Sequence, residues 1–155
     1  MGGGSWPKLG SDGAWVQLLA QRGVEVAALR PANCGFDIDW SEHFRTRFAG
    51  HPVKPVVVSF TEASGAAHRR QGEFVVTANG VEGSLVYALS AALRDGIAAR
   101  GGAVLHLDLA PGWELPRLID ELSRPRGSRS LSSHLQSRTG IKGVKAGLLR
   151  EVLSE

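Results

Sequence analysis

The sequence has little cysteine and no long apolar run, and both absences exclude classes of protein. Cys34 is the only cysteine, so no disulfide can form within the chain, and a reducing compartment is favoured. No apolar stretch approaches the ~20 residues that a transmembrane helix needs. The sequence also does not open with the charged region followed by an apolar region that is typical of a secretory signal peptide. We therefore expect a cytoplasmic protein without a membrane partner.

Several catalytic motifs are also absent. The histidines are scattered and form no ligand pair with a third donor, so no metal site is predicted; they are His43, His51, His68, His106 and His134. No Gly-x-Ser-x-Gly elbow of a hydrolase occurs. No strand is followed by the Gly-x-Gly-x-x-Gly turn that holds a dinucleotide pyrophosphate at a helix N-terminus. The chain is therefore not expected to contain a nucleotide-binding domain.

The composition is that of an ordinary globular protein, but its charge is uneven. The chain has 155 residues, of which 43% are hydrophobic and 21% charged, enough for one domain with a buried core. Residues 117–150 hold eight basic and two acidic side chains, a net charge of +6 against +3 for the whole chain. This basic third could contact nucleic acid, phosphates or an acidic partner, or it could be a solvated helix surface.

Hydrophobic periodicity predicts strands first and helices afterwards. Alternation predicts strands at 24–29, 36–40, 54–60, 69–77 and 103–109. Helices are predicted at 12–22, 41–49, 83–93, 114–123, 130–138 and 143–153, with Ser, Asp or Gly at several of their ends. This order predicts an α+β fold: a mainly antiparallel sheet followed by a helical subdomain.

A glycine-rich run opens the chain. Residues 2–13 read Gly-Gly-Gly-Ser-Trp-Pro-Lys-Leu-Gly-Ser-Asp-Gly. Such a turn normally follows a strand, because it lets the backbone pass close to a ligand or to another backbone. No strand precedes it, so we expect a chain cut from a larger protein. The run resembles the turn that, in BaiN-like NAD(P)/FAD-dependent flavoproteins, leads from the nucleotide-binding domain into an inserted domain.

Three later segments resemble the same family and occur in its order. They are Arg-Pro-Ala-Asn-Cys-Gly-Phe at 30–36, Gly-Glu-Phe-Val-Val-Thr-Ala-Asn-Gly-Val-Glu-Gly-Ser at 72–84 and Arg-Pro-Arg-Gly-Ser-Arg-Ser-Leu at 124–131. The resemblance points to a proteobacterial-type branch of poorly defined function. It implies a β-barrel-like sheet, and it divides the chain into a linker from a missing FAD-binding domain (1–12), a β-rich insert domain (13–112) and a helical subdomain (113–155).

The resemblance also implies residues near a flavin. Gly3 and Gly4 match paired glycines that approach the cofactor in the family. The alternative is that they belong to a disordered N-terminal leader. The segment 77–84 matches a loop that reads Thr-His-x-Gly-x-Ser-Gly-Pro near flavin and substrate, which implies cofactor contacts from Thr77, Gly80 and Gly83. Here Ala78, Glu82 and Ser84 replace the family's His, Ser and Pro. No catalytic residue is therefore carried over, and Glu82 is either a substrate contact or a favourable charge in a first helical turn.

Arginines at 124–129 form a second candidate site. Arg124, Arg126 and Arg129 meet at a predicted helix-capping turn and could grip a phosphate or a substrate, because guanidinium groups bind such oxyanions bidentately. The alternative is ordinary capping by Ser128 or Ser130, with the arginines in solvent.

Together these features predict the inserted, substrate-side lid domain of a flavin-dependent NAD(P)H oxidoreductase. FAD would be held in the intact parent protein and not by the isolated chain, which would be inactive. The expected partners are the FAD-binding domain of the parent protein and a small-molecule substrate. The alternatives are a stand-alone basic module that binds RNA or DNA, and a truncated product without a function of its own. The basic third lacks the interleaved aromatic side chains that single-stranded nucleic acid would stack on.

Overall fold

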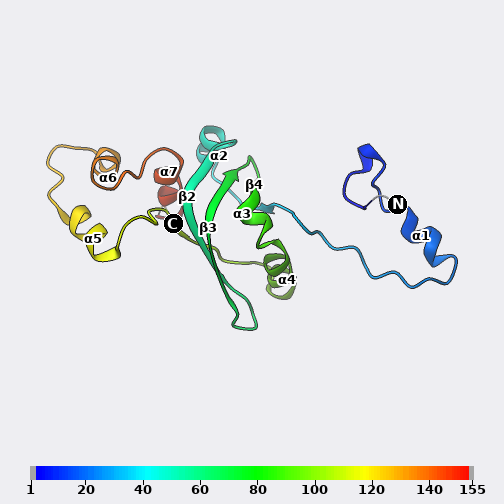
Figure 1. Ribbon diagram of the computed structural model, residues 1–155. Helices are drawn as coiled ribbons and strands as arrows, with labels where there is room; N and C mark the ends of the chain where they lie inside the picture. Colours follow the sequence, from blue (N-terminus) through cyan, green and yellow to red (C-terminus); the bar gives the residue numbers. More distant parts are fainter. Residues whose placement is uncertain (1–2, 154–155) are drawn as a thin grey trace. The chain divides into compact units, whose positions relative to one another are not determined.

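The computed structural model describes residues 3–153, and the chain divides into two compact units after residue 32. The first unit contains a 3-10 helix, η1 (Pro7–Leu9), and one helix, α1 (Trp15–Ala20) (Figure 1). The backbone N–H of Ala14 donates to Asp12 Oδ1 at 3.0 Å just before α1 begins, as expected for an Asp that starts a helix. The predicted helix is confirmed.

The strand predicted at 24–29 is wrong. These residues are extended, but among the described residues they pair with no other strand. Alternating hydrophobicity shows that a segment suits a pleated surface, whereas a strand also needs a partner backbone.

The second unit is built on one antiparallel sheet with the strand order β1-β4-β3-β2-β5. Its strands are β1 (Phe36–Asp37), β2 (Pro52–Thr61), β3 (Ala67–Val76), β4 (Gly80–Glu82) and β5 (His106–Asp108). Its helices are α2 (Glu42–Phe48), α3 (Ser84–Tyr87), α4 (Ser90–Arg100), α5 (Leu115–Ser123), α6 (Leu131–Thr139) and α7 (Val144–Leu153). The predicted α+β class and antiparallel sheet are confirmed.

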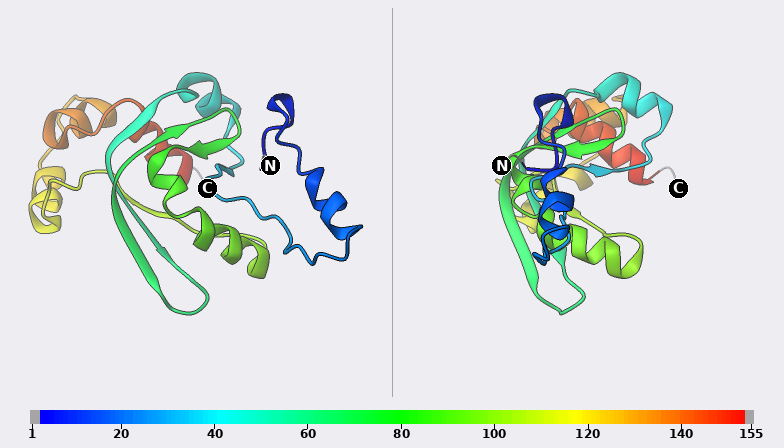
Figure 2. Two further views of the ribbon diagram at one scale, coloured as in Figure 1. Left: turned by 45° about the vertical axis from the view of Figure 1, so that its right-hand side comes forward. Right: turned by 90° about the vertical axis from the view of Figure 1, so that its right-hand side faces the viewer.

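The sheet is open, so the predicted barrel-like closure is not seen. The long hairpin of β2 and β3 curls strongly, and Gly65 at its tip has a φ of 87°, a turn conformation that favours glycine (Figure 2). The outer strands β1 and β5 have two and three residues and do not pair with each other in the described part of the chain. Strands this short offer few backbone groups with which to close a barrel.

The core lies between the hairpin and the helices that pack on it. Figure 1 shows α3 and α4 beside β3, and α5 to α7 beyond β2. Phe60 and Val76 of the hairpin are almost fully buried and belong to one apolar cluster with Leu85, Leu89 and Leu93. Burying a side chain of this size stabilises the fold by about 2 kcal/mol.

The helix predicted at 83–93 is divided into α3 and α4. The Ser90 hydroxyl donates to the Tyr87 carbonyl at 2.8 Å where the first helix ends. Leu85, Leu89 and Leu93 nevertheless keep the four-residue spacing and remain buried, so the predicted apolar face is preserved across the break.

The three predicted C-terminal helices are confirmed as α5, α6 and α7. The Ser130 hydroxyl caps α6 by accepting the Ser133 N–H at 3.1 Å. The Lys145 ammonium ties α7 to the sheet by donating to the carbonyls of Pro55 at 2.5 Å and Leu109 at 2.7 Å. Partial burial lowers the pKa of this amine. None of the helices described within residues 3–153 is long and apolar enough to cross a bilayer.

Candidate functional site

The segment 77–84, predicted to be a loop next to a flavin, contains a short strand and the first residue of a helix. Only 77–79 form a turn, in which the Asn79 N–H donates to Thr77 Oγ1 at 3.3 Å and the Thr77 N–H donates to the Gly80 carbonyl at 2.8 Å. The next three residues form β4, which pairs with both β1 and β3. The expectation of an open glycine loop is therefore corrected to a tight turn followed by a central strand.

Gly80 and Gly83 are both required by the protein's own backbone. A Cβ atom on Gly80 would lie 1.9 Å from the Phe36 carbonyl oxygen on β1, and the Trp40 indole N–H also donates to the Gly80 carbonyl at 3.1 Å. Gly83 has a φ of 107°, and a Cβ atom there would lie 3.4 Å from Phe74 Cα. These contacts explain the two glycines without a ligand, and their contact with a flavin stays a prediction.

Four residues of this segment are exposed and can contact something outside the chain. They are Ala78 and Asn79 in the turn, Glu82 on β4 and Ser84 at the start of α3, whereas Thr77 is half-buried. Glu82 precedes α3, so it is not part of the first helical turn, and α3 itself has only four residues. The contact of Glu82 with a substrate stays a prediction.

Gly3 and Gly4 belong to the first unit and take part in a closed turn there. The Gly13 N–H donates to the Gly3 carbonyl at 3.2 Å, and a Cβ atom on Gly4 would lie 2.6 Å from Leu29 Cδ1. Within the described residues this segment is thus folded on itself rather than a floppy leader. The predicted contact of these glycines with a flavin stays a prediction.

The three candidate arginines lie on the exposed connection between α5 and α6. Arg124 pairs with Glu121 at 3.0 Å and with Asp120 at 3.4 Å. Arg129 donates from its side chain to the Ser137 hydroxyl at 3.4 Å, and its backbone N–H donates to the Arg126 carbonyl at 3.4 Å. The capping role proposed for Ser130 is confirmed, while a phosphate contact from these arginines stays a prediction.

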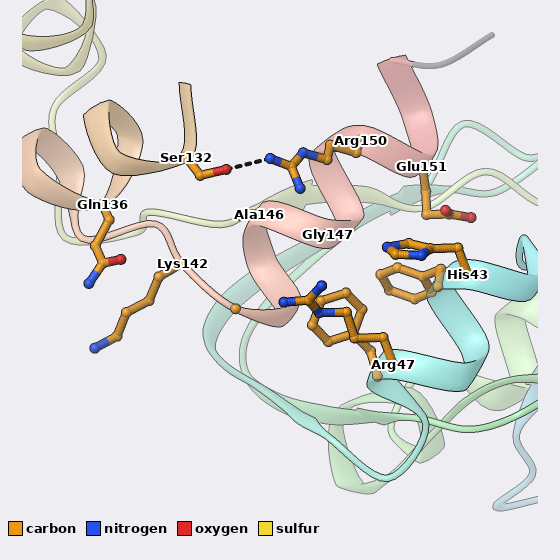
Figure 3. Close-up of a pocket in the computed structure, with 12 residues that line it drawn as sticks. His43, Arg47, Ser132, Gln136, Lys142, Ala146, Gly147, Arg150 and Glu151 are labelled. Atoms are coloured by element: carbon orange, nitrogen blue, oxygen red, sulfur yellow. Dashed lines mark hydrogen bonds between the residues drawn. The ribbon is translucent and has the colours of Figure 1, made fainter. Parts of the chain in front are cut away.

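Sequence reasoning missed a small hollow between α2, α6 and α7, which we call the basic hollow. Figure 3 shows Arg150 of α7 reaching Ser132 of α6, with Arg47 approaching from α2. The hollow has a volume of about 160 Å³. Its full lining is His43, Phe44, Arg47, Phe48, Ser132, Gln136, Lys142, Gly143, Ala146, Gly147, Arg150 and Glu151. The only signal in the sequence was the basic charge of 117–150, because Arg47 comes from a distant segment.

A wider groove runs between β2, the segment after β5 and the start of α7. Its volume is about 530 Å³, and Trp113 and Lys145 line it. The Arg117 guanidinium lies over the Trp113 ring, 4.9 Å from its centroid, and the Lys145 ammonium is used by two carbonyls. The Lys145 ammonium and the Trp113 ring therefore already have partners within the protein.

No group of three or more metal-ligating side chains is present within the described residues 3–153. Cys34 is half-buried. The hydrogen bond with Asp95 raises the pKa of the nearby Arg94.

Comparison with known families gives one clear result. A family model described as the HI0933-like protein barrel and H2TH domain matches residues 30–153. The matched residues coincide closely with the second structural unit, and Gly3 and Gly4 lie outside them. No curated protein matches the chain.

Proposed function

The chain belongs to the family of HI0933-like barrel and H2TH domains, and from that premise we propose that it is the inserted, substrate-side domain of a flavin-dependent oxidoreductase. The observation that carries the proposal is the family match over the whole second unit. A BaiN-like protein is the specific parent that we propose.

In such a parent, FAD is bound by another domain and this domain covers it. The proposal is supported by the lack of a dinucleotide-binding turn in the sequence. It is also supported by the structure around Gly80 and Gly83, whose neighbours are backbone atoms of β1 and β3. A covering domain excludes water and shapes the substrate pocket, whereas the cofactor carries the redox chemistry.

The face offered to flavin or substrate would be the turn at 77–79 together with Glu82. The turn is held rigidly by its own hydrogen bonds and by the pairing of β4 on both edges. Asn79 and Glu82 expose an amide and a carboxylate there. These groups can orient a polar substrate, but neither replaces the histidine that the related loop carries.

Titration of FAD into the purified chain tests the assignment of the cofactor to another domain. We expect a colourless preparation and no saturable change in flavin fluorescence at micromolar concentrations. A dissociation constant of about 1 μM or tighter would overturn the proposal, because the ~8 kcal/mol of binding it represents requires a complete cofactor site in this chain.

A further inference from the structure

We propose that the basic hollow between α2, α6 and α7 is a binding site for the phosphate group of a small phosphorylated compound. The inference does not depend on the flavin role, because the hollow includes none of the residues assigned to that role.

Cationic side chains from three separate segments line the hollow. Arg47 comes from α2, Lys142 from the connection before α7, and Arg150 from α7. Neither Arg47 nor Lys142 forms an ion pair with a carboxylate in the described part of the chain, and both are exposed. Three cationic side chains that line one hollow create a local positive potential that favours an oxyanion.

The single carboxylate of the hollow is engaged elsewhere. Glu151 accepts the Ser41 hydroxyl at 2.6 Å and the Ser41 N–H at 3.0 Å, and so lies at the N-terminal end of α2. Arg150 donates to the Ser132 hydroxyl, which orients its guanidinium at the α6 side of the hollow (Figure 3). Ser132 and Gln136 add neutral hydrogen-bonding groups. The lining thus carries a net charge of +2 with polar groups from two further side chains.

The floor of the hollow is apolar and close-packed. Phe44 and Phe48 lie with ring centroids 5.1 Å apart. Gly147 on α7 faces these rings so closely that a Cβ atom there would lie 2.5 Å from Phe48 Cε2. This close approach brings α7 against α2, and the Arg47 guanidinium lies over the Phe48 ring, 5.6 Å from its centroid. A ligand with an apolar or aromatic body would contact this floor while its anionic group meets Arg47 and Lys142.

The size of the hollow decides between classes of ligand. Pockets that enclose a whole drug-sized ligand have volumes of about 300–1,000 Å³, so a hollow of about 160 Å³ fits a head group and a small part of its body. A phosphate monoester satisfies these requirements, because its oxygens accept from the forked guanidinium of Arg47 and from the Lys142 ammonium.

Titration of the full chain with inorganic phosphate and with phenyl phosphate tests the inference, with the backbone amide signals of Phe48, Ala146 and Gly147 followed by NMR. We expect saturable shifts at these amides, with a dissociation constant of about 1 mM for phosphate and tighter binding of phenyl phosphate because of the aromatic floor. Arg47→Gln and Lys142→Gln are each expected to weaken phenyl phosphate binding about tenfold.

Arg69→Gln is the matched control, because it removes the same charge from an exposed arginine on β3 that does not line the hollow. Binding that is unchanged within about twofold in this variant supports a specific site, since only distant screened charge is lost. Equal weakening by Arg69→Gln and Arg47→Gln, or shifts that never saturate, would overturn the inference in favour of diffuse electrostatic attraction. A single-stranded RNA that shifts the same amides at far lower concentration than phenyl phosphate would also overturn it, because the occupant would then be a nucleic acid.

Discussion

At the scale of single residues, Gly80 is the position with the least space for a side chain. The position that a Cβ atom would take at Gly80 is occupied by the carbonyl oxygen of Phe36 on the neighbouring strand. A Cβ atom is fixed by the backbone of residue 80, and the Phe36 oxygen is itself a backbone atom. No side-chain rotamer change can therefore relieve the clash that an alanine would introduce. We predict that Gly80→Ala lowers the free energy of unfolding by about 3 kcal/mol, measured by chemical denaturation.

Gly102→Ala is the control for this prediction, because a Cβ atom at Gly102 would meet nothing within 4 Å. That variant should keep the stability of the native chain or gain slightly from a less flexible unfolded state. Equal stabilities for the two variants would mean that the close approach of β1 to β4 does not constrain residue 80.

A second residue-scale prediction concerns the ion pair at the tip of the long hairpin. His68 Nε2 lies 2.6 Å from Glu62 Oε1, and hydrogen bonds from His68 and then from Ser64 lower the pKa of Glu62. A carboxyl group with a depressed folded-state pKa stabilises the fold above its unfolded-state pKa. That contribution is lost as the pH falls through the folded-state value.

NMR titration of the Glu62 carboxyl should therefore give a midpoint below the ordinary value of 4.5. His68→Ala should raise the midpoint more than Ser64→Ala, because the bond from His68 is the larger cause. The opposite ranking, or a midpoint at or above 4.5 in the native chain, would contradict the geometry of this pair.

At the scale of elements, Ser41 links α2 to α7 by hydrogen bonds. The Ser41 hydroxyl accepts the Phe44 N–H at 3.1 Å as the cap of α2 and donates to Glu151 of α7 at 2.6 Å. Loss of a serine cap costs about 1 kcal/mol, and here the hydrogen bond from the Ser41 hydroxyl to Glu151 is lost as well, while the bond from the Ser41 N–H remains.

We predict that Ser41→Ala lowers the free energy of unfolding by about 2 kcal/mol, measured by chemical denaturation. Ser130→Ala provides the comparison, because Ser130 caps α6 in the same way and no hydrogen bond joins it to another element in the described residues. That variant should lose about 1 kcal/mol. Equal losses would show that Glu151 contributes nothing through Ser41.

The elements also show how far the sequence could predict this fold. The helix at Ser41 and the helices α5 to α7 could be predicted because caps and spacing are local features. β4 could not, because a three-residue strand becomes recognisable only when β1 and β3 are seen on its two sides. For the same reason the close approach of Gly80 to Phe36, 44 positions away in the sequence, could not be predicted. The basic hollow could not be predicted either, since its cations converge only after α2 packs on α7.

At the scale of the whole molecule, the chain has a folded second unit that matches a known family and no motif for holding a dinucleotide. The family match ends within two residues of the unit's last residue and begins three residues before its first. A unit with its own apolar core can be inserted into another domain without loss of its fold. This combination underlies the proposal that the unit covers a flavin that another domain binds.

A chimera tests this central claim most directly. Residues 30–153 would replace the corresponding segment of a HI0933-like flavoprotein, and a second version would carry a short Gly-Ser linker at the same place. The proposal predicts that the graft shields the flavin, so that iodide quenches flavin fluorescence less in the chimera than in the linker version. Substitution of Asn79 or Glu82 by alanine should partly restore the quenching or shift the flavin absorbance, whereas Arg124→Gln should do neither. Equal quenching in the chimera and the linker version, with both retaining FAD, would contradict the assignment of this chain as a flavin-covering domain.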